Sequence, residues 1–215
     1  MKRYIYRAVI KENVNFNIIE YFIMNSDKIK KFVDEEILMT VSAYSLYKHL
    51  IVYYECMEGE MRPSEIFPGL DIYLETWPDK PEEKYWVRMM DVFHVTEPAG
   101  NENWRRVLPV EKRIGRLGRL KPEMVSSYIF YHFQLQEEQY LKENKYMIIG
   151  LNDNLLFLYE EIPNAVADFQ YEGMLKTKNS PASDWENLMN PHFIPWENVP
   201  APDNKLLECE TLIEF

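Results

Sequence analysis

Two similar stretches decide the fold: LIVYYE at residues 50–55 and LLFLYE at residues 155–160. The first is rich in β-branched and aromatic residues, which favour strands, and the second is a similar apolar run of leucines with Phe and Tyr. Each follows another strand-like run, at residues 39–45 and 146–151 respectively. In the second pair the connecting residues 152–154 are Asn-Asp-Asn, which suits a tight turn. The sequence therefore predicts the same β-hairpin twice.

The segments around the two hairpins recur in the same order. An alternating strand-like stretch precedes each hairpin and is followed by a segment with apolar residues three and four apart, the helical period. A second helical pattern and a further extended stretch follow each hairpin. The predicted strands before the hairpins are 3–10 and 113–120, the first helices 17–33 and 122–140, and the later helical patterns 64–77, 84–92 and 185–189, with a closing strand at 206–215.

This order predicts an α+β protein made of two ferredoxin-like β-α-β-β-α-β repeats, residues 1–108 and 109–215. Such a unit has an antiparallel sheet with helices on one face and an apolar face left over. We expect the two apolar faces to pack sheet to sheet, as an intramolecular dimeric α+β barrel. A fused pair of this kind is compatible with a monomer or a homodimer.

The amino-acid composition and net charge disfavour several classes of function. The 215 residues are 47% hydrophobic and 27% charged, as in a folded protein, and the formal net charge of −11 disfavours nucleic-acid binding. Two cysteines cannot form a disulfide framework, and neither a signal-like region nor a membrane-length apolar stretch occurs. We therefore expect a cytoplasmic protein without membrane or nucleic-acid partners. The sequence contains no nucleotide-binding glycine motif, and its four histidines lack metal-ligand spacing, so we expect neither cofactor nor metal.

One motif is more specific. After Lys121-Pro122-Glu123, the second repeat carries Tyr128 and His132, four residues apart and so on one face of the predicted helix. With the strand and hairpin that surround it, this Y-x-x-x-H pair resembles the L-rhamnose mutarotase family. That family consists of small dimeric α+β barrels that interconvert sugar anomers without a cofactor.

The resemblance implies roles for individual residues. It implies that His132 is the proton donor and that Tyr128 and Tyr146 bind the sugar. The family's W-W-x-Y-M-x-D run is similar to residues 85–91 in the first repeat, with Tyr85 and Trp86, and to residues 185–189 in the second. In the second repeat Trp185 keeps the first tryptophan of that run, and Glu186 stands in place of the second.

The first repeat departs from the family pattern. Tyr21 keeps the sugar-binding position, but Asn25 stands where the histidine is expected. We therefore expect one working site, in the second repeat, with a monosaccharide as ligand.

The expected function is a cofactor-independent sugar mutarotase or epimerase. Opening and reclosing a pyranose requires one proton to reach the ring oxygen while another leaves the anomeric hydroxyl, and a histidine with a pKa near 6.5 can do either. Tyr146 and Trp185 offer flat apolar faces to a sugar ring. Among the acidic residues Asp91, Glu160 and Glu186 are candidates to orient a hydroxyl or the imidazole.

A different class of function fits the same residues. A lone histidine among aromatic residues is commonly a packed core side chain, and tyrosines and tryptophans on helical stripes commonly belong to the core. The alternative is therefore a non-catalytic small-ligand-binding barrel. Convergence of Tyr128 and His132 on one open cleft favours catalysis, whereas a buried His132 bonded to backbone favours the binding protein.

Overall fold

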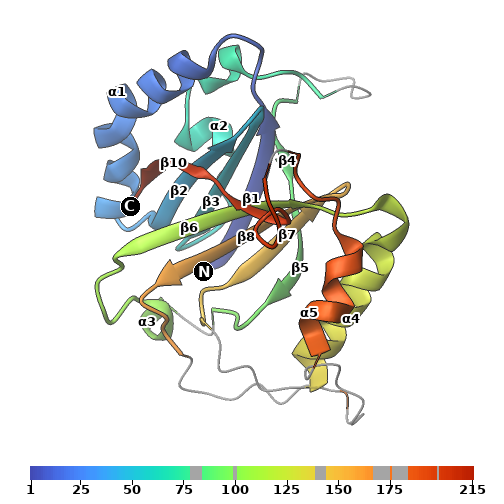
Figure 1. The fold of residues 1–215 in the computed structure, drawn as a ribbon. Helices are drawn as coiled ribbons and strands as arrows, with labels where there is room; N and C mark the ends of the chain where they lie inside the picture. Colours follow the sequence, from blue (N-terminus) through green and yellow to red (C-terminus); the bar gives the residue numbers. More distant parts are fainter. Residues whose placement is uncertain (78–83, 99–100, 139–143, 167–174, 176–183, 198) are drawn as a thin grey trace. The chain divides into compact units, whose positions relative to one another are not determined.

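The fold is that of a computed structural model (Figure 1), which describes all residues except 78–83, 99–100, 139–143, 167–174, 176–183 and 198. The chain divides into two compact units. Unit 1 comprises residues 1–89, 98–107 and 209–215, and unit 2 comprises residues 90–97 and 108–208. Each unit is built around a five-stranded antiparallel sheet with helices, so the predicted α+β class is confirmed.

The sheet of unit 1 has the strand order β10-β2-β3-β1-β4. Its helix α1 is long and amphipathic, and it buries Ile18, Tyr21, Phe22 and Ile29. The other helical elements of unit 1 are short. The bounds are β1 Lys2–Val9, α1 Asn15–Asp34, β2 Leu38–Leu46, β3 His49–Cys56, α2 Pro63–Ile66, the 3-10 helix η1 Leu70–Tyr73, β4 Val87–Arg88, α3 Asn101–Trp104 and β10 Glu210–Glu214.

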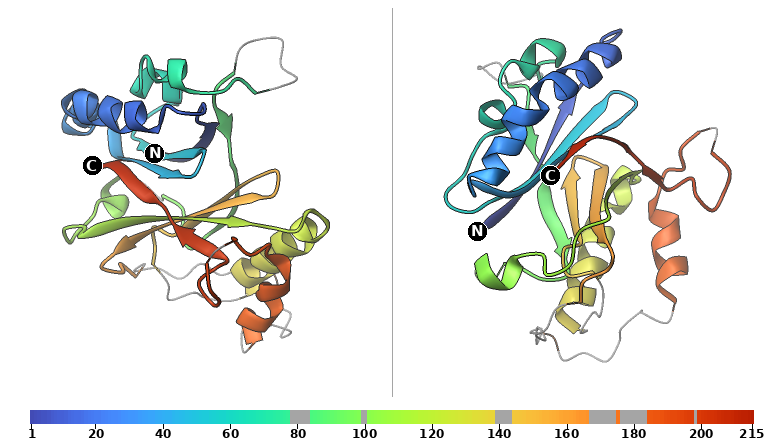
Figure 2. Two further views of the ribbon diagram at one scale, coloured as in Figure 1. Left: turned by 45° about the horizontal axis from the view of Figure 1, so that its top comes forward. Right: turned by 90° about the vertical axis from the view of Figure 1, so that its left-hand side faces the viewer.

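The sheet of unit 2 has the order β5-β7-β8-β6-β9, which repeats the order of unit 1. Helices α4 and α5 lie beside each other on one side of this sheet (Figures 1 and 2). The bounds are β5 Met90–His94, β6 Lys112–Arg119, η2 Pro122–Met124, α4 Val125–Glu138, β7 Ile148–Asn152, β8 Leu155–Ile162, α5 Trp185–Met189, η4 Asn190–His192 and β9 Leu206–Glu208. The predicted helix 122–140 agrees with η2 and α4 up to residue 138, and its last two residues lie outside the described part of the chain.

The fourth strand of each repeat is divided between the units. β4 pairs with β1 in unit 1, but β5, which begins two residues after β4 ends, pairs with β7 in unit 2. In the same way β9 pairs with β6 in unit 2, whereas β10 pairs with β2 in unit 1. The compact units therefore differ from two contiguous repeats, 1–108 and 109–215, at residues 90–97, 108 and 209–215.

Residues 84–92, predicted as helical, instead contain β4 and the start of β5, so that prediction is wrong. Val92 and Phe93 are buried while Met90 is exposed. Pairing with β1 and β7 satisfies the backbone of this segment, and this tertiary pairing outweighs a short local helical pattern.

The strand pairing corrects the alignment of the repeats by one residue. His49 and Leu155 both open the second hairpin strand, so Leu50 corresponds to Leu156 rather than to Leu155. On this register Glu55 corresponds to Glu161, because they lie opposite Arg3 and Arg113 in the first strands. A shift of one residue moves every side chain to the other face of a sheet, so the correction decides which residues are equivalent.

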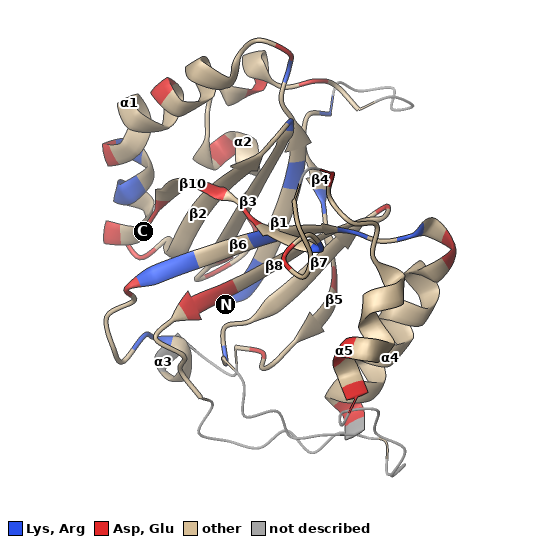
Figure 3. Ribbon diagram, viewed as in Figure 1, with Lys and Arg blue, Asp and Glu red and all other residues tan. Residues whose placement is uncertain are grey.

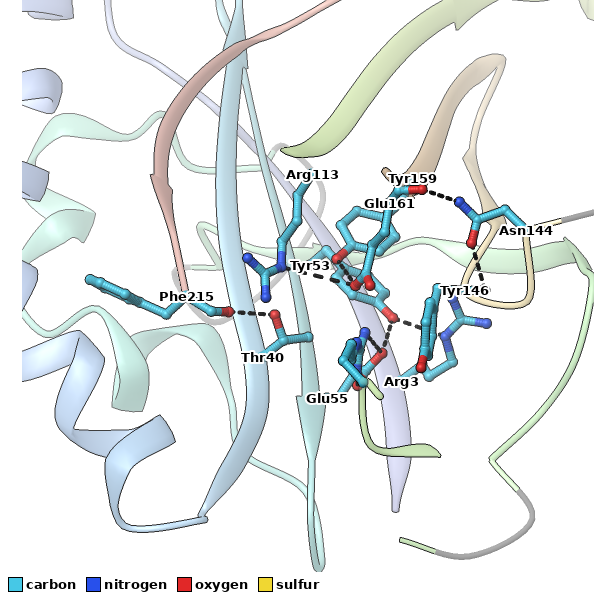
Figure 4. Close-up of polar contacts among 11 residues, drawn as sticks. Arg3, Thr40, Tyr53, Glu55, Arg113, Asn144, Tyr146, Tyr159, Glu161 and Phe215 are labelled. Atoms are coloured by element: carbon cyan, nitrogen blue, oxygen red, sulfur yellow. Dashed lines mark hydrogen bonds and ion pairs between the residues drawn. The ribbon is translucent and has the colours of Figure 1, made fainter. Parts of the chain in front are cut away.

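The corrected register reveals a polar pattern present in both units. The Tyr53 hydroxyl donates to the Glu55 carboxylate in unit 1, and the Tyr159 hydroxyl donates to the Glu161 carboxylate in unit 2, at 2.6 Å (Figure 4). In unit 1 the fully buried Glu55 also accepts two hydrogen bonds from the Arg106 guanidinium, at 2.6 and 3.0 Å. This bidentate contact fixes the segment before β6 to the unit 1 sheet.

Among the described residues, no helix is long and apolar enough to cross a membrane.

Candidate functional site

Unit 2 contains a cavity of about 760 Å³ between its sheet and helices α4 and α5. The size lies within the usual range for small-molecule sites. Most of its wall is apolar and comes from Phe93, Leu135, Met147, Ile149, Leu158 and Met189. The remaining wall includes Tyr128, His132 and Trp185, together with a set of polar side chains: Arg116, Glu186, Asn190, Asp203 and Lys205.

Helix α4 brings Tyr128 and His132 to the same wall of the cavity, as their spacing predicts. Their ring centroids are 4.0 Å apart. His132 is buried, and its Nδ1 lies 2.9 Å from the backbone carbonyl oxygen of Tyr128. Because a carbonyl oxygen can only accept, Nδ1 carries the proton, and Nε2 of the neutral ring is an acceptor. Among the described residues, neither Nε2 nor the Tyr128 hydroxyl has a hydrogen-bond partner.

Burial keeps both groups uncharged at neutral pH. It lowers the pKa of His132 to about 4, an effect that the hydrogen bond to the Tyr128 carbonyl partly opposes and that nearby His192 reinforces. Burial also raises the pKa of Tyr128 above its ordinary value of 10.0. The pair therefore offers a hydroxyl donor and an imidazole acceptor without net charge.

Trp185 and Glu186, in the first turn of α5, complete this side of the cavity. The Trp185 ring meets the His132 ring edge to face, with centroids 4.9 Å apart, and Phe93 contacts His132 from the sheet at 5.5 Å. Glu186 is exposed at the cavity rim. Four of the predicted site residues, Tyr128, His132, Trp185 and Glu186, thus line one cavity.

Tyr146 does not line this cavity. It is buried just before β7, and its backbone N–H lies 3.2 Å from Oδ1 of Asn144, in the region drawn in Figure 4. Its neighbour Met147 and then Ile149 line the cavity, and successive side chains of an extended chain point to opposite faces. Tyr146 therefore lies outside the wall of this cavity.

In unit 1 the counterparts of Tyr128 and His132 are Tyr21 and Asn25 on α1. Asn25 donates from Nδ2 to the Tyr21 carbonyl oxygen at 2.9 Å, which reproduces the hydrogen bond made by His132. The Tyr21 hydroxyl donates to the carbonyl oxygen of Pro68 at 3.1 Å, and its ring is buried. The unit 1 helix thus keeps the backbone contact but not the titratable ring.

Tyr85 and Trp86 pack in unit 1 and are not the counterparts of Trp185 and Glu186. The Trp86 indole N–H donates to Asp71 at 3.1 Å, and the Tyr85 carbonyl oxygen accepts from the Trp77 indole at the same distance. Two isolated β-bridges occupy matching positions. Leu74, just after η1, pairs with Ile10, just after β1; Phe193, just after η4, pairs with Leu120, just after β6. Residues 63–73 are therefore the counterpart of residues 185–192.

Sequence reasoning missed Arg116, Asn190, Asp203 and Lys205, all on the cavity wall. Arg116 shares the inward face of β6 with Ile114 and Gly118, a placement that the strand pairing shows and that the alternation of the sequence alone does not. The Lys205 ammonium donates to Asn190 Oδ1 at 2.7 Å. The cavity rim also includes Pro202, so part of the proline-rich segment before β9 borders the site.

The other histidines of unit 2 lie elsewhere. His94 contacts the Asp91 carboxylate through Nδ1 at 2.9 Å, so Asp91 does not orient His132. The buried His192 contacts the Ser127 hydroxyl through Nε2 at 2.9 Å. Within the described ranges, no group of three or more histidine, cysteine or acidic residues could hold a metal ion.

Comparison with known proteins adds little to this geometry. No family model and no curated protein matches the chain. A proposed monooxygenase from Fusobacterium nucleatum subsp. nucleatum ATCC 25586 aligns with 99% of this chain and 92% of its own, at 12% identity and a TM-score of 0.42. A proposed monooxygenase from Lactobacillus acidophilus NCFM aligns with 99% of this chain and 94% of its own, at 9% identity and a TM-score of 0.41. Likenesses this distant carry no argument about function.

Proposed function

We propose that unit 2 binds a small, uncharged, ring-shaped ligand with hydroxyl groups, of the monosaccharide class, in the cavity between its sheet and α4 and α5. The observation that carries the proposal is the cavity itself, about 760 Å³, with the Tyr128 and His132 rings on its wall. Apolar walls suit the C–H faces of a ring, and a few polar groups fix its orientation. Because both titratable groups are uncharged at neutral pH, they favour hydroxyl groups over ions.

Binding can be tested through the tryptophan in the wall. In a ¹H–¹⁵N spectrum, the indole signal of Trp185, assigned from Trp185→Phe, is followed while a panel of pyranoses beginning with L-rhamnose is added. Trp196 is the internal control, because its indole N–H is buried against the Leu117 carbonyl oxygen, at 3.2 Å, outside the cavity wall. A saturable shift of Trp185 with Trp196 unchanged supports binding, and a Trp185 signal that stays still throughout the panel refutes it.

Sugar mutarotation is a second candidate, favoured by the contact between the Tyr128 and His132 rings in the cavity wall. In this reaction Nε2 of His132 would take the proton of the anomeric hydroxyl as the bond from C1 to the ring oxygen breaks. The ring oxygen would take the Tyr128 hydroxyl proton, and both transfers reverse on closure. Both groups are poor at these transfers, since an imidazole with a pKa of about 4 is a weak base and the raised pKa makes Tyr128 a weak acid. This is why binding ranks first.

Catalysis is tested by exchange spectroscopy between sugar anomers. His132→Asn is the informative variant, because Asn25 makes the same carbonyl hydrogen bond in unit 1 while lacking a base. Acceleration by the wild type that disappears in His132→Asn supports mutarotation. Binding without acceleration leaves the cavity as a ligand-binding site and removes the catalytic candidate.

A further inference from the structure

The two units differ at three matching positions on the helix-covered face of their sheets. In unit 1 these positions hold Tyr4, Tyr6 and Tyr54, whose rings stack with centroids 5.5 to 6.5 Å apart. By strand pairing, Tyr4 and Tyr54 lie opposite each other, as do Ile114 and Glu160 in unit 2, and Arg116 takes the place of Tyr6.

In unit 1 both the rings and the hydroxyl groups of the three tyrosines have partners. Their rings fill the sheet face, and their hydroxyls donate to the segment after β3: Tyr4 to the Gly59 carbonyl oxygen at 3.3 Å, Tyr6 to the Glu60 carboxylate at 3.1 Å and Tyr54 to the Met61 carbonyl oxygen at 2.6 Å. In unit 2 the stack is replaced by an ion pair between Arg116 and Glu160. Of these two residues, Arg116 lines the unit 2 cavity.

The ion pair places a charge-balanced guanidinium on the cavity wall. The Glu160 side chain is 18% exposed and that of Arg116 is 28% exposed, so the pair is partly shielded from water. Figure 3 shows basic residues along β6. One Nη group of Arg116 is occupied by Glu160, and among the described residues its other N–H groups bond to no protein atom. These N–H groups are donors available to a ligand, while their positive charge is already balanced.

We infer that Arg116, held by Glu160, is the specificity-determining residue of the unit 2 cavity: it donates to an uncharged oxygen of the ligand, and Glu160 makes the site reject anions. The inference rests on the proposed binding function. An anion placed at Arg116 would meet the Glu160 carboxylate at the same guanidinium, whereas a hydroxyl or carbonyl oxygen accepts a hydrogen bond without that repulsion.

The inference is tested with two probes that share a phenyl ring and differ in charge, benzyl alcohol and benzoate, titrated against the full chain and followed through the Trp185 indole signal. The wild type is expected to bind the alcohol at least tenfold more tightly than benzoate. In Glu160→Gln, which keeps an oxygen acceptor for Arg116, benzoate affinity should rise about tenfold while the affinity for the alcohol changes less than twofold. Glu123→Gln, an exposed position on η2, is the control for the change in net charge.

A second variant keeps the test independent of that substitution. Arg116→Tyr with Glu160→Tyr reproduces the tyrosine pair that the equivalent strands of unit 1 already accommodate, and it should remove the Arg116 donors from the cavity wall and abolish binding of both probes. Preference of the wild type for benzoate, no response to Glu160→Gln, or undiminished binding in the double tyrosine variant would each overturn the inference while the cavity still binds. If a pyranose binds but neither probe does, the inference fails alone; if no pyranose binds either, the proposed binding function fails and the inference fails with it.

Discussion

The buried imidazole of His132 makes a quantitative prediction about stability and pH. Its pKa falls from an ordinary 6.5 to about 4 in the folded chain, chiefly because burial disfavours the charged ring. Between these pH values the unfolded chain binds the proton and the folded chain does not, so the stability contribution is complete above pH 6.5 and is lost as the pH falls to 4. At 1.36 kcal/mol per pKa unit, the loss is about 3 kcal/mol.

The perturbation is His132→Asn, since asparagine makes the equivalent carbonyl hydrogen bond on α1 and does not titrate. Urea unfolding of wild type and variant is measured from pH 7.5 to pH 4.0, and the difference between their unfolding free energies cancels the other titrating groups. We expect this difference to move by about 3 kcal/mol in favour of the variant as the pH falls. Chemical shifts of the His132 ring protons give the midpoint independently. A difference that stays constant with pH, or a midpoint near 6.5, would refute the reasoning.

Three further predictions concern residues in the sheets of the two units. Glu55→Gln should cost about 3–5 kcal/mol in urea unfolding, because it removes the carboxylate that pairs with the nearly buried Arg106 guanidinium. A smaller loss in the Glu55→Gln, Arg106→Met double variant would identify the buried Arg106 charge as the cause. Burial alone would raise the pKa of Glu55, but Arg106 lowers it from 4.5 to about 2, so wild type should lose stability from pH 4.5 to pH 2 and Glu55→Gln should lack that component. Gly118→Ala should lower stability by about 1–3 kcal/mol, measured as a fall in Tm, because the added Cβ would lie 2.7 Å from Leu206 Cδ2 and 3.1 Å from the Lys205 carbonyl oxygen; an unchanged Tm would mean that both neighbours move aside freely.

The parts of the fold that the sequence predicted correctly are those that local pattern specifies. Alternation and β-rich composition identified both hairpins, and the helical period identified α1 and α4. The division of the fourth strand was not predictable in this way, because β5 and β10 contain no local signal for the sheet edge that each pairs with. The alignment of the repeats also slipped by one residue, since the runs at 50–55 and 155–160 are similar in either register.

The candidate site was predictable in part for the same reason. A spacing of four along a helix is enough to place Tyr128 and His132 together, and Trp185 joins them because α5 packs beside α4. Arg116 was missed because a basic residue in an alternating strand has the same appearance whether it faces solvent or a cavity. Only the strand pairing, which sets it opposite Leu158 and matches it to Tyr6, identifies it as inward-facing.

The division of the fourth strand limits how this chain can be taken apart. A fragment ending at residue 108 would carry β5 without β7, its pairing partner, and would leave the β2 edge of its own sheet without β10. An uncovered edge of this kind is a template for association with another chain. Separately expressed halves should therefore recombine or aggregate, and a version of unit 1 alone would need residues 209–215 linked directly to the rest of that unit.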